Sequence, residues 1–369
     1  MRLTRVIADL EPGGAQLHVL RLARALVAHG ITTNVLAGHV TPDGWRLAEA
    51  AGVTVDAWDA PHRLQYEPDP GFAAWLEPRL AHADVVHAHM FGAWWAAARA
   101  APAATPLVGS EHNPLRWPGA ERGDELCEGL RRVDLFFAHG RQATASVRAA
   151  GLPGARVREG RSPVVGFDAV PRRDLPPRRI VFSGRLHPDK GPDVLLEAVA
   201  RLRAAPPTYV LGSGPEGDAL RARAAALGLA RTVRFVGWQD EPAPWVAGAA
   251  VFVQPSRDEA WSQSAVLALG LGVPVVGTDV DDLPLTLADG RGIVVAAEDP
   301  DALAAALRGV LEGRLSTDLE AARAYARRYE LPRIAEYYAS AYDQLRAQPS
   351  RAGSVHSPSA TAERDVRQT

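Results

Sequence analysis

Short apolar runs alternate with segments of helical spacing along most of the chain. In the first half the runs lie near residues 6–8, 32–37, 53–57, 84–89, 107–112 and 135–138. Between the first two, leucines, alanines and valines recur at helical spacing from Leu17 until Gly30. This alternation predicts a parallel sheet covered by helices on both faces.

The same alternation restarts after a stretch rich in Pro and Arg at 166–178. Further strands are expected near 179–183, 208–211, 232–236, 249–253, 273–277 and 292–295. The pattern predicts an α/β protein with two Rossmann-like, doubly wound domains, at 1–166 and 167–330, facing each other across a cleft. Ligands of such sheets bind beyond the carboxyl ends of the strands. We expect an amphipathic helix at 331–346 to cross back to the first domain, and the tail 347–369 to be disordered.

Composition narrows the classes of function. The 369 residues carry a formal net charge of −2, which argues against a nucleic-acid partner. A single cysteine excludes an internal disulfide. No apolar stretch is long enough for a signal peptide or a membrane span, so we expect a cytoplasmic protein without stable membrane insertion.

Two cations in one short loop give the first chemical clue. Arg185 and Lys190 follow the apolar strand at 179–183, and a helix is expected to open at Pro192. Permanent cations at a strand's carboxyl end, beside a helix N-terminus, are typical of a diphosphate site. We expect both side chains to face the cleft without a carboxylate partner.

A second polar segment, 257–264, precedes an apolar helix. Ser262 is the expected N-cap, and the free backbone amides of residues 263–265 are expected to face an anion. Glu259 suits neutral hydroxyl groups rather than a phosphate. Diphosphate beside amides and hydroxyls beside a carboxylate describe a nucleotide sugar; the plainer alternative is a capped helix with a solvated glutamate.

Several weaker motifs keep two interpretations. Gly13 and Gly14 form either a close approach to a ligand or a tight turn. The glycines at 212–217 favour a turn lining a nucleotide site over a nicotinamide or flavin site. Asp279 and Asp281 are not expected to hold a metal, although spaced carboxylates can.

Histidines close the expected strands of the first half. The pair at 87 and 89 could suggest zinc, but hydrogen bonding to substrate or backbone is favoured. His112 is the better functional candidate because its neighbours are polar. We expect no metal and no cofactor.

Together these segments resemble family 4 of the retaining glycosyltransferases, which have the GT-B fold. The resemblance covers about 1–345. It is carried by Gly13-Gly-Ala-Gln16, Asp84-Val-Val-His-Ala-His89, Ser110-Glu-His112, Ser183-Gly-Arg-Leu-x-x-x-Lys-Gly191, Gly212-Ser-Gly-Pro215, Pro255-Ser-x-x-Glu259 and Gly272-Val-Pro-Val-Val276.

The resemblance implies roles for individual residues. Arg185 and Lys190 would bind the donor diphosphate, Glu259 the donor sugar, and His112 would lie beside the transferred sugar. The remaining donor-binding residues would be Gly13, Gly14, Gly237, Trp238, Ser262, Gln263, Ser264 and Leu267; acceptor-binding residues would be His89, Glu111 and Trp117, with Trp94 and Trp95 either nearby or in the core.

Two positions depart from the family pattern. Leu267 stands where the family usually has a second glutamate that grips the ribose, so the nucleoside would be held by backbone near Gly237 and Trp238. The usual Gly-Gly-x-Pro-Glu loop reads Asp281-Asp-Leu-Pro-Leu285. The segment Glu259-Ala-Trp-Ser-Gln263, together with Leu267, is similar to actinobacterial enzymes that glycosylate aminocyclitols in aminoglycoside antibiotic pathways.

The resemblance therefore implies retaining transfer of a hexose or N-acetylhexosamine from a UDP-sugar to a small hydroxyl acceptor, for example 2-deoxystreptamine. Three alternatives remain: a nucleotide-sugar 2-epimerase, a sugar-nucleotide-binding protein without turnover, and, last, a nicotinamide oxidoreductase.

Overall fold

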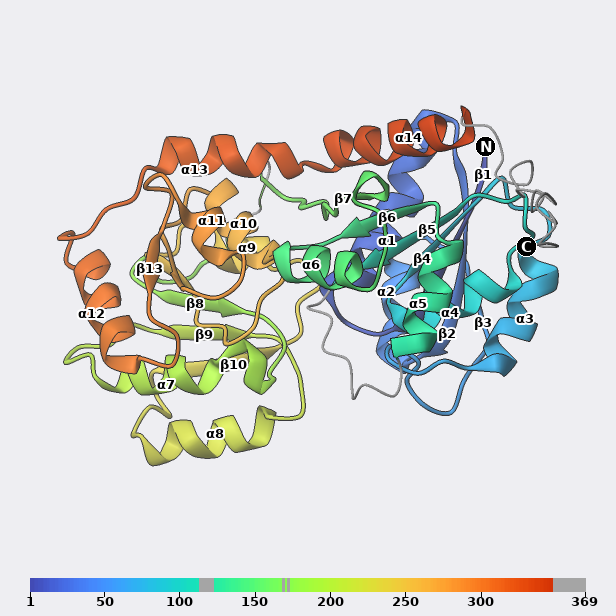
Figure 1. The fold of residues 1–369 in the computed structure, drawn as a ribbon. Coiled ribbons are helices and arrows are strands. Elements are labelled where there is room, and N and C mark those ends of the chain that lie inside the picture. Colours follow the sequence, from blue (N-terminus) through green and yellow to red (C-terminus); the bar gives the residue numbers. More distant parts are fainter. Residues whose placement is uncertain (113–122, 168–169, 171–172, 348–369) are drawn as a thin grey trace, which may run out of the picture.

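Two lobes lie side by side in the computed structural model, which describes residues 1–112, 123–167, 170 and 173–347 (Figure 1). The first lobe contains a seven-stranded parallel sheet in the order β3-β2-β1-β4-β5-β6-β7. Its strands are β1 (Arg2–Leu10), β2 (Thr32–Val40), β3 (Val55–Ala57), β4 (Val85–His89), β5 (Leu107–Glu111), β6 (Leu135–Ala138) and β7 (Val157–Glu159). Its helices are α1 (Gly14–Ala25), α2 (Pro42–Ala50), α3 (Pro70–Leu80), α4 (Phe91–Ala100), α5 (Gly123–Arg132) and α6 (Arg141–Ala149).

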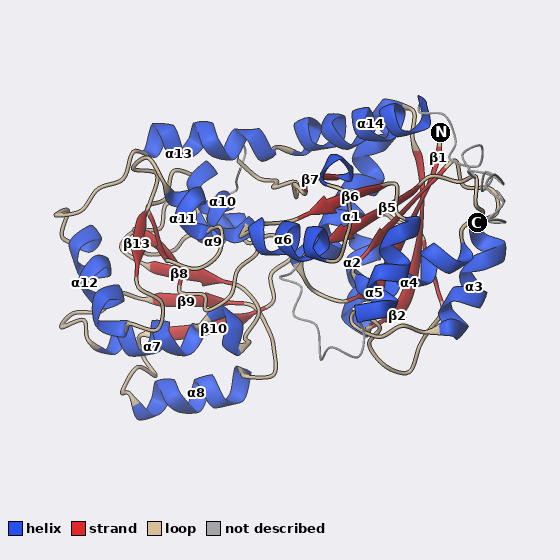
Figure 2. Cartoon of the chain, in the orientation of Figure 1, coloured by secondary structure: helices blue, strands red, loops and turns tan. Residues whose placement is uncertain are grey.

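The second lobe contains a six-stranded parallel sheet in the order β10-β9-β8-β11-β12-β13. Its strands are β8 (Ile180–Ser183), β9 (Thr208–Leu211), β10 (Val233–Gly237), β11 (Val251–Gln254), β12 (Val275–Thr278) and β13 (Ile293–Val295). Its helices are α7 (Pro192–Ala200), α8 (Gly217–Ala226), α9 (Ala243–Val246), α10 (Gln263–Gly270), α11 (Leu283–Leu287) and α12 (Pro300–Leu311). Figure 2 shows both sheets with helices around them. The predicted pair of doubly wound, parallel sheets is confirmed.

The strand order fixes where each lobe can bind a ligand. In each sheet the order reverses once, between β1 and β4 in the first lobe and between β8 and β11 in the second. Loops that leave neighbouring strands in opposite directions open a crevice at such a point. The segments after β1, β8 and β11 therefore begin at binding crevices, and they carry Gly13, Arg185 and Glu259.

The cores explain two of the open sequence interpretations. Trp94 and Trp95 are buried in the core of the first lobe, at 0% and 3% exposure, so they do not face an acceptor. The edge strand β7 was not expected from the sequence, because Arg158 and Glu159 leave it no apolar run.

The C-terminal helices return to the first lobe. After α13 (Leu319–Ala326), helix α14 (Leu331–Ala347) runs along the top of the molecule in Figure 1 and packs on α1. Its Tyr338 and Tyr342 are fully buried. The boundary at 166 remains a proposal, and the tail predicted to be disordered lies, from 348 onward, outside the described residues. None of the described helices combines the length and apolar character that crossing a membrane requires.

Candidate active site

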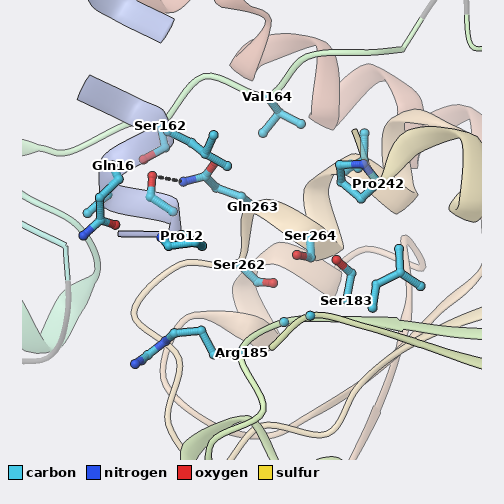
Figure 3. A pocket seen from close by; sticks show the side chains of 18 of the residues that line it. Pro12, Gln16, Ser162, Val164, Ser183, Arg185, Pro242, Ser262, Gln263 and Ser264 are labelled. Atoms are coloured by element: carbon cyan, nitrogen blue, oxygen red, sulfur yellow. Dashed lines mark hydrogen bonds between the residues drawn. The ribbon is translucent and has the colours of Figure 1, made fainter. Parts of the chain in front are cut away.

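A cavity of about 460 Å³ lies between the two lobes. In Figure 3, Pro12, Gln16 and Ser162 face Ser183, Ser262 and Ser264 across it. A second cavity of about 480 Å³ adjoins the first. The walls of both cavities include Gln65, His112, Arg185, Lys190 and Glu259. These five residues mark the junction of the two cavities.

Most of the expected donor residues lie on the wall of the first cavity. They are Gly13, Gly14, His112, Arg185, Lys190, Trp238, Glu259, Ser262, Gln263, Ser264 and Leu267. The structure thus brings together residues that are up to 254 positions apart, from Gly13 to Leu267. Folding of both lobes is needed to build this wall.

The two cations differ in their partners. Arg185 follows β8, and within the described residues no hydrogen bond or ion pair engages its guanidinium. Lys190 ends the short 3-10 turn η4 (Pro188–Lys190), and its Nζ lies 2.9 Å from Oε2 of Glu259. The expectation that both cations are free of carboxylates is therefore wrong for Lys190. Since Glu259 also lines the cavity, the ion pair still places both side chains on the cavity wall.

Glu259 is held in place from several sides. Its Oε2 accepts hydrogen bonds from Gln254 and Ser256 as well as Lys190, and its backbone N–H donates to Asp281 at 2.6 Å. The residue is only 6% exposed. Among the described residues, none donates to Oε1. One carboxylate oxygen can therefore accept a hydrogen bond from a ligand hydroxyl.

Helix α10 directs its N-terminus into the cavity. Ser262 is its N-cap, as predicted, because its hydroxyl accepts a hydrogen bond from the Ala265 N–H at 3.1 Å. Capping uses one of the three amides expected to face an anion and leaves those of Gln263 and Ser264. Gln263 also donates a 2.9 Å hydrogen bond to the carbonyl of Gly14, across the two lobes.

Gly14 occupies a position where a side chain would collide. A Cβ there would lie 2.8 Å from the Gln263 amide nitrogen. The close approach at Gly14 is thus real, and its immediate neighbour is the other lobe.

Four sequence expectations need correction or lie beyond the structure. His89 and Glu111 are fully buried and line neither cavity; Glu111 accepts a hydrogen bond from the His112 N–H instead. Both belong to the last residues of central strands, which helices cover. Gly237 is absent from both cavity walls, and its carbonyl accepts from Gly212 in a neighbouring turn. Trp117 lies outside the described residues.

The structure adds residues that the sequence reasoning did not select. Gln16, Arg21, His139 and Ser162 line the first cavity. Arg21 donates to the Pro163 carbonyl and to Gln263, and burial lowers its pKa to about 10, so it remains charged at neutral pH. His139 follows β6 directly, and this position at the same sheet edge as His112 was the available signal.

The carboxylates of the Asp279 and Asp281 pair are engaged by the backbone. Asp279 accepts from the Ala297 N–H at 2.8 Å, and Asp281 accepts from the Glu259 N–H. Asp281 also accepts from Gln142, and its carbonyl accepts from Arg141 of the first lobe. These contacts give Asp281 a structural role at the junction of the lobes, whereas Asp279 is held within the second lobe.

Family models match both lobes. Residues 12–159 match glycosyltransferase family 4, and residues 177–313 match glycosyl transferases group 1. The chain is 31% identical over 358 residues to a D-inositol 3-phosphate glycosyltransferase of Streptomyces scabiei, covering 80% of this chain and 78% of that protein. It is equally 31% identical to the protein of the same name from Streptomyces avermitilis, over 81% of this chain and 75% of that protein.

Solved structures share the fold at low sequence identity. HepE of Anabaena in complex with UDP superposes with a TM-score of 0.75 at 19% identity, covering 93% of this chain and 100% of that one. WaaG, a glycosyltransferase involved in lipopolysaccharide biosynthesis, superposes with a TM-score of 0.69 at 18% identity, over 92% and 99% of the two chains. The two family models match the two lobes in turn, and the relatives are 31% identical over most of the chain. The chain therefore belongs to family 4 of the glycosyltransferases and has the GT-B fold.

Proposed function

We propose that the protein transfers a hexose or N-acetylhexosamine from a UDP-sugar to a hydroxyl group of a small cyclitol, with retention at the anomeric carbon. The observation that carries the proposal is the grouping of Arg185, Lys190 and the amides of α10 in one interlobe cavity. Cations and free amides suit a diphosphate. UDP bound to the structural neighbour HepE supports this choice of nucleotide.

The first cavity would hold the donor. Diphosphate oxygens would lie against Arg185, Lys190 and the amides of Gln263 and Ser264. The free Oε1 of Glu259 would accept from a sugar hydroxyl. Leu267 offers the ribose no hydrogen bond, so the nucleoside would be held by other groups of the wall, among them Trp238.

The second cavity would hold the acceptor, because it shares His112, Arg185, Lys190 and Glu259 with the first. Its own residues include Arg63, Tyr66, Glu67, His187 and Asp258. Carboxylates beside cations suit a polyhydroxylated ring that carries charged substituents. Inositol 3-phosphate, for which the relatives are named, belongs to this class of compounds. An aminocyclitol such as 2-deoxystreptamine belongs to it as well.

Chemistry would proceed on one face of the sugar. The bond from the anomeric carbon to the leaving phosphate oxygen breaks, and the bond to the acceptor oxygen forms on the same face. The acceptor proton passes to the leaving phosphate oxygen, and UDP departs. The protein would contribute positioning and stabilisation of the charge that grows on the diphosphate.

A panel of nucleotide sugars tests the donor, and a panel of cyclitols tests the acceptor. We expect UDP-sugars to raise the melting temperature and to yield UDP only when an acceptor is added. Inositol 3-phosphate and 2-deoxystreptamine distinguish an anionic from a cationic ring, and the coupling constant of the product's anomeric proton reports retention. Donor consumption without acceptor would identify an epimerase instead. Tight donor binding without any transfer would identify a binding protein.

A further inference from the structure

Five histidines and one arginine form a buried cluster behind the junction of the two cavities. They are His18 of α1, His87 and His89 of β4, His112 after β5, His139 after β6, and Arg5 of β1. The rings of His112 and His139 stack with centroids 4.0 Å apart, and His18 lies 4.8 Å from His112. Only His112 and His139 reach the wall of the first cavity.

Arg5 determines the direction of the hydrogen bonds in this cluster. Its Nη1 lies 3.1 Å from Nε2 of His89. A guanidinium can only donate, so Nε2 of His89 must accept and the ring proton must be on Nδ1. Nδ1 of His89 lies 3.1 Å from Nε2 of His112. That N–H therefore donates to His112, whose Nε2 must be unprotonated.

We propose that Arg5 and His89 are positioning residues that hold His112 as the neutral tautomer with its proton on Nδ1. His112 then presents a fixed N–H donor to the donor sugar or to the diphosphate. Among the described residues, no group accepts from Nδ1 of His112, which leaves it available to a ligand. This inference rests on the proposed function for the identity of that ligand, but the tautomer itself does not.

A second branch from Arg5 supports the same direction. Its Nη2 donates to the Tyr342 hydroxyl at 3.1 Å, and that hydroxyl lies 2.7 Å from Nδ1 of His87. Because this hydroxyl already accepts from Arg5, we assign it as the donor to His87, whose Nε2 atom lies 2.7 Å from Ser110 Oγ. All of these bonds are satisfied with neutral histidines, and the branch links α14 to the same arginine.

The groups around His112 oppose its protonation. Arg5 of β1, His18 of α1, His87 and His89 of β4, and His139 after β6 surround it, with Tyr338 of α14 packed on His18. Glu111 of β5 contacts its backbone N–H. Burial is the largest cause that lowers the pKa of His112 well below its ordinary value, and neighbouring histidines and Arg5 add to it. The neutral donor thus persists into acidic solution.

A metal site is the rival explanation for this cluster. Ligand nitrogens of His18, His89 and His112 lie within 4.8 Å of one another, and within the described chain both ring nitrogens of His18 lack a partner. A metal-bound histidine, however, normally donates its other N–H to an acceptor. His89 instead faces the donor-only Arg5, whose charge also repels a cation.

Histidine side-chain ¹⁵N NMR of the full-length protein tests the tautomer directly. The His112 signals are assigned by their loss in His112→Gln. We expect a protonated Nδ1 and an unprotonated Nε2 from pH 6 to 8. A protonated Nε2, an imidazolium, or stoichiometric zinc binding that His18→Ala abolishes would overturn the inference. Because this readout needs no substrate, it stands or fails separately from the proposed transfer reaction.

Two variants at position 89 test the positioning role. In His89→Gln the amide oxygen can accept from Arg5 and the amide nitrogen can donate to His112, whereas His89→Leu can do neither. We expect His89→Leu to lower kcat by about 10- to 100-fold, by analogy with other residues that orient a histidine. The ¹⁵N signals of His112 in this variant should no longer report a single Nδ1–H tautomer. His89→Gln should restore most of kcat and the Nδ1–H tautomer. Equal losses of kcat in both variants, with the His112 tautomer unchanged, would contradict the role.

Discussion

Lys190 engages only one oxygen of Glu259: Nζ lies 2.9 Å from Oε2, and no described residue donates to Oε1. The side chains of the two residues are 18% and 8% exposed, so the pair is shielded from solvent but open to the cavity. A donor molecule can therefore bring its phosphate to the ammonium and a hydroxyl to the carboxylate without separating them first. In the proposed function, the ion pair would thus serve both ends of a sugar diphosphate.

Lys190→Ala should reduce turnover with donor bound. In the proposed reaction the ammonium would oppose charge that grows on the leaving diphosphate, and its loss should cost about 2–4 kcal/mol, or about 30- to 1000-fold in kcat. Steady-state kinetics at saturating donor measure this effect. Arg314→Ala, at an exposed ion pair with Glu312 in the second lobe, is the control and should retain wild-type kcat. Unchanged turnover in Lys190→Ala would reject the assigned role.

Acid should destabilise the protein through its buried histidines. Burial lowers the pKa of His139 to about 3 and those of His18, His87, His89 and His112 well below the ordinary value. Below about pH 6.5 the unfolded chain binds protons that the native state does not, so the free energy of unfolding falls. Each such histidine contributes about 1.4 kcal/mol per pH unit.

Urea unfolding between pH 5 and 7.5 measures this slope. In His139→Phe the slope of the unfolding free energy against pH should decrease by the contribution of one bound proton, about 1.4 kcal/mol per pH unit. This follows because phenylalanine binds no proton in the unfolded chain, whereas His139, with its lowered native pKa, does. A slope that does not change would mean that His139 is already protonated in the native state or solvated there.

A glycine at the lobe junction should be needed for full activity. Gly140, at the start of α6, has a φ of +94°, and a Cβ there would lie 2.6 Å from the carbonyl oxygen of Ala260, next to Glu259. Gly151 has a similar φ of +93° but no atom within 4 Å of its Cβ position. Alanine strains the backbone at both positions, yet only Gly140→Ala should displace the Glu259 loop.

We expect Gly140→Ala to lose about 10- to 100-fold in kcat/KM, because small displacements of reacting groups have effects of this size. Gly151→Ala should lose stability but keep the kcat/KM of the folded enzyme. Thermal unfolding measures the backbone strain in both variants. Steady-state kinetics with varied donor concentration measure the effect of the contact with Ala260, which only Gly140→Ala makes. An unchanged kcat/KM in both variants would show that the Glu259 loop tolerates the displacement.

A chelator should leave transfer intact. Asp279 and Asp281 accept hydrogen bonds from backbone amides, and two cations on the cavity wall would already neutralise a bound diphosphate. Initial rates with and without EDTA, after dialysis, provide the measurement. Complete inactivation that Mg²⁺ or Mn²⁺ reverses would assign a metal to these carboxylates.

The sequence predicted the fold well because its signals are local. Apolar runs followed by polar residues located the central strands of both sheets, and Pro192 and Ser262 correctly marked helix starts. The edge strand β7 was not predicted because an edge strand does not need a run of buried apolar residues. Trp94 and Trp95 remained ambiguous because spacing does not say which face of a helix meets a core.

The site was harder to predict where it depends on packing. Arg185, Lys190 and Glu259 follow strand ends, so chain order alone brought them to the cleft. His89 and Glu111 also end strands, but both are fully buried, His89 beside His18 of α1, and a sequence does not reveal such burial. Arg5 left one signal, a charge inside the otherwise mostly apolar strand at 2–10.

The return of α14 to the first lobe affects how the polypeptide acquires its structure. The Tyr342 hydroxyl accepts from Arg5 and lies 2.7 Å from Nδ1 of His87, and Tyr338 packs against His18. Domains usually fold in order as they leave the ribosome. Here the first lobe stays incomplete until α14 has been synthesised, more than 150 residues after the last strand of the N-terminal sheet. A product that terminates before α14 would therefore contain the residues of that sheet but not its aligned histidines.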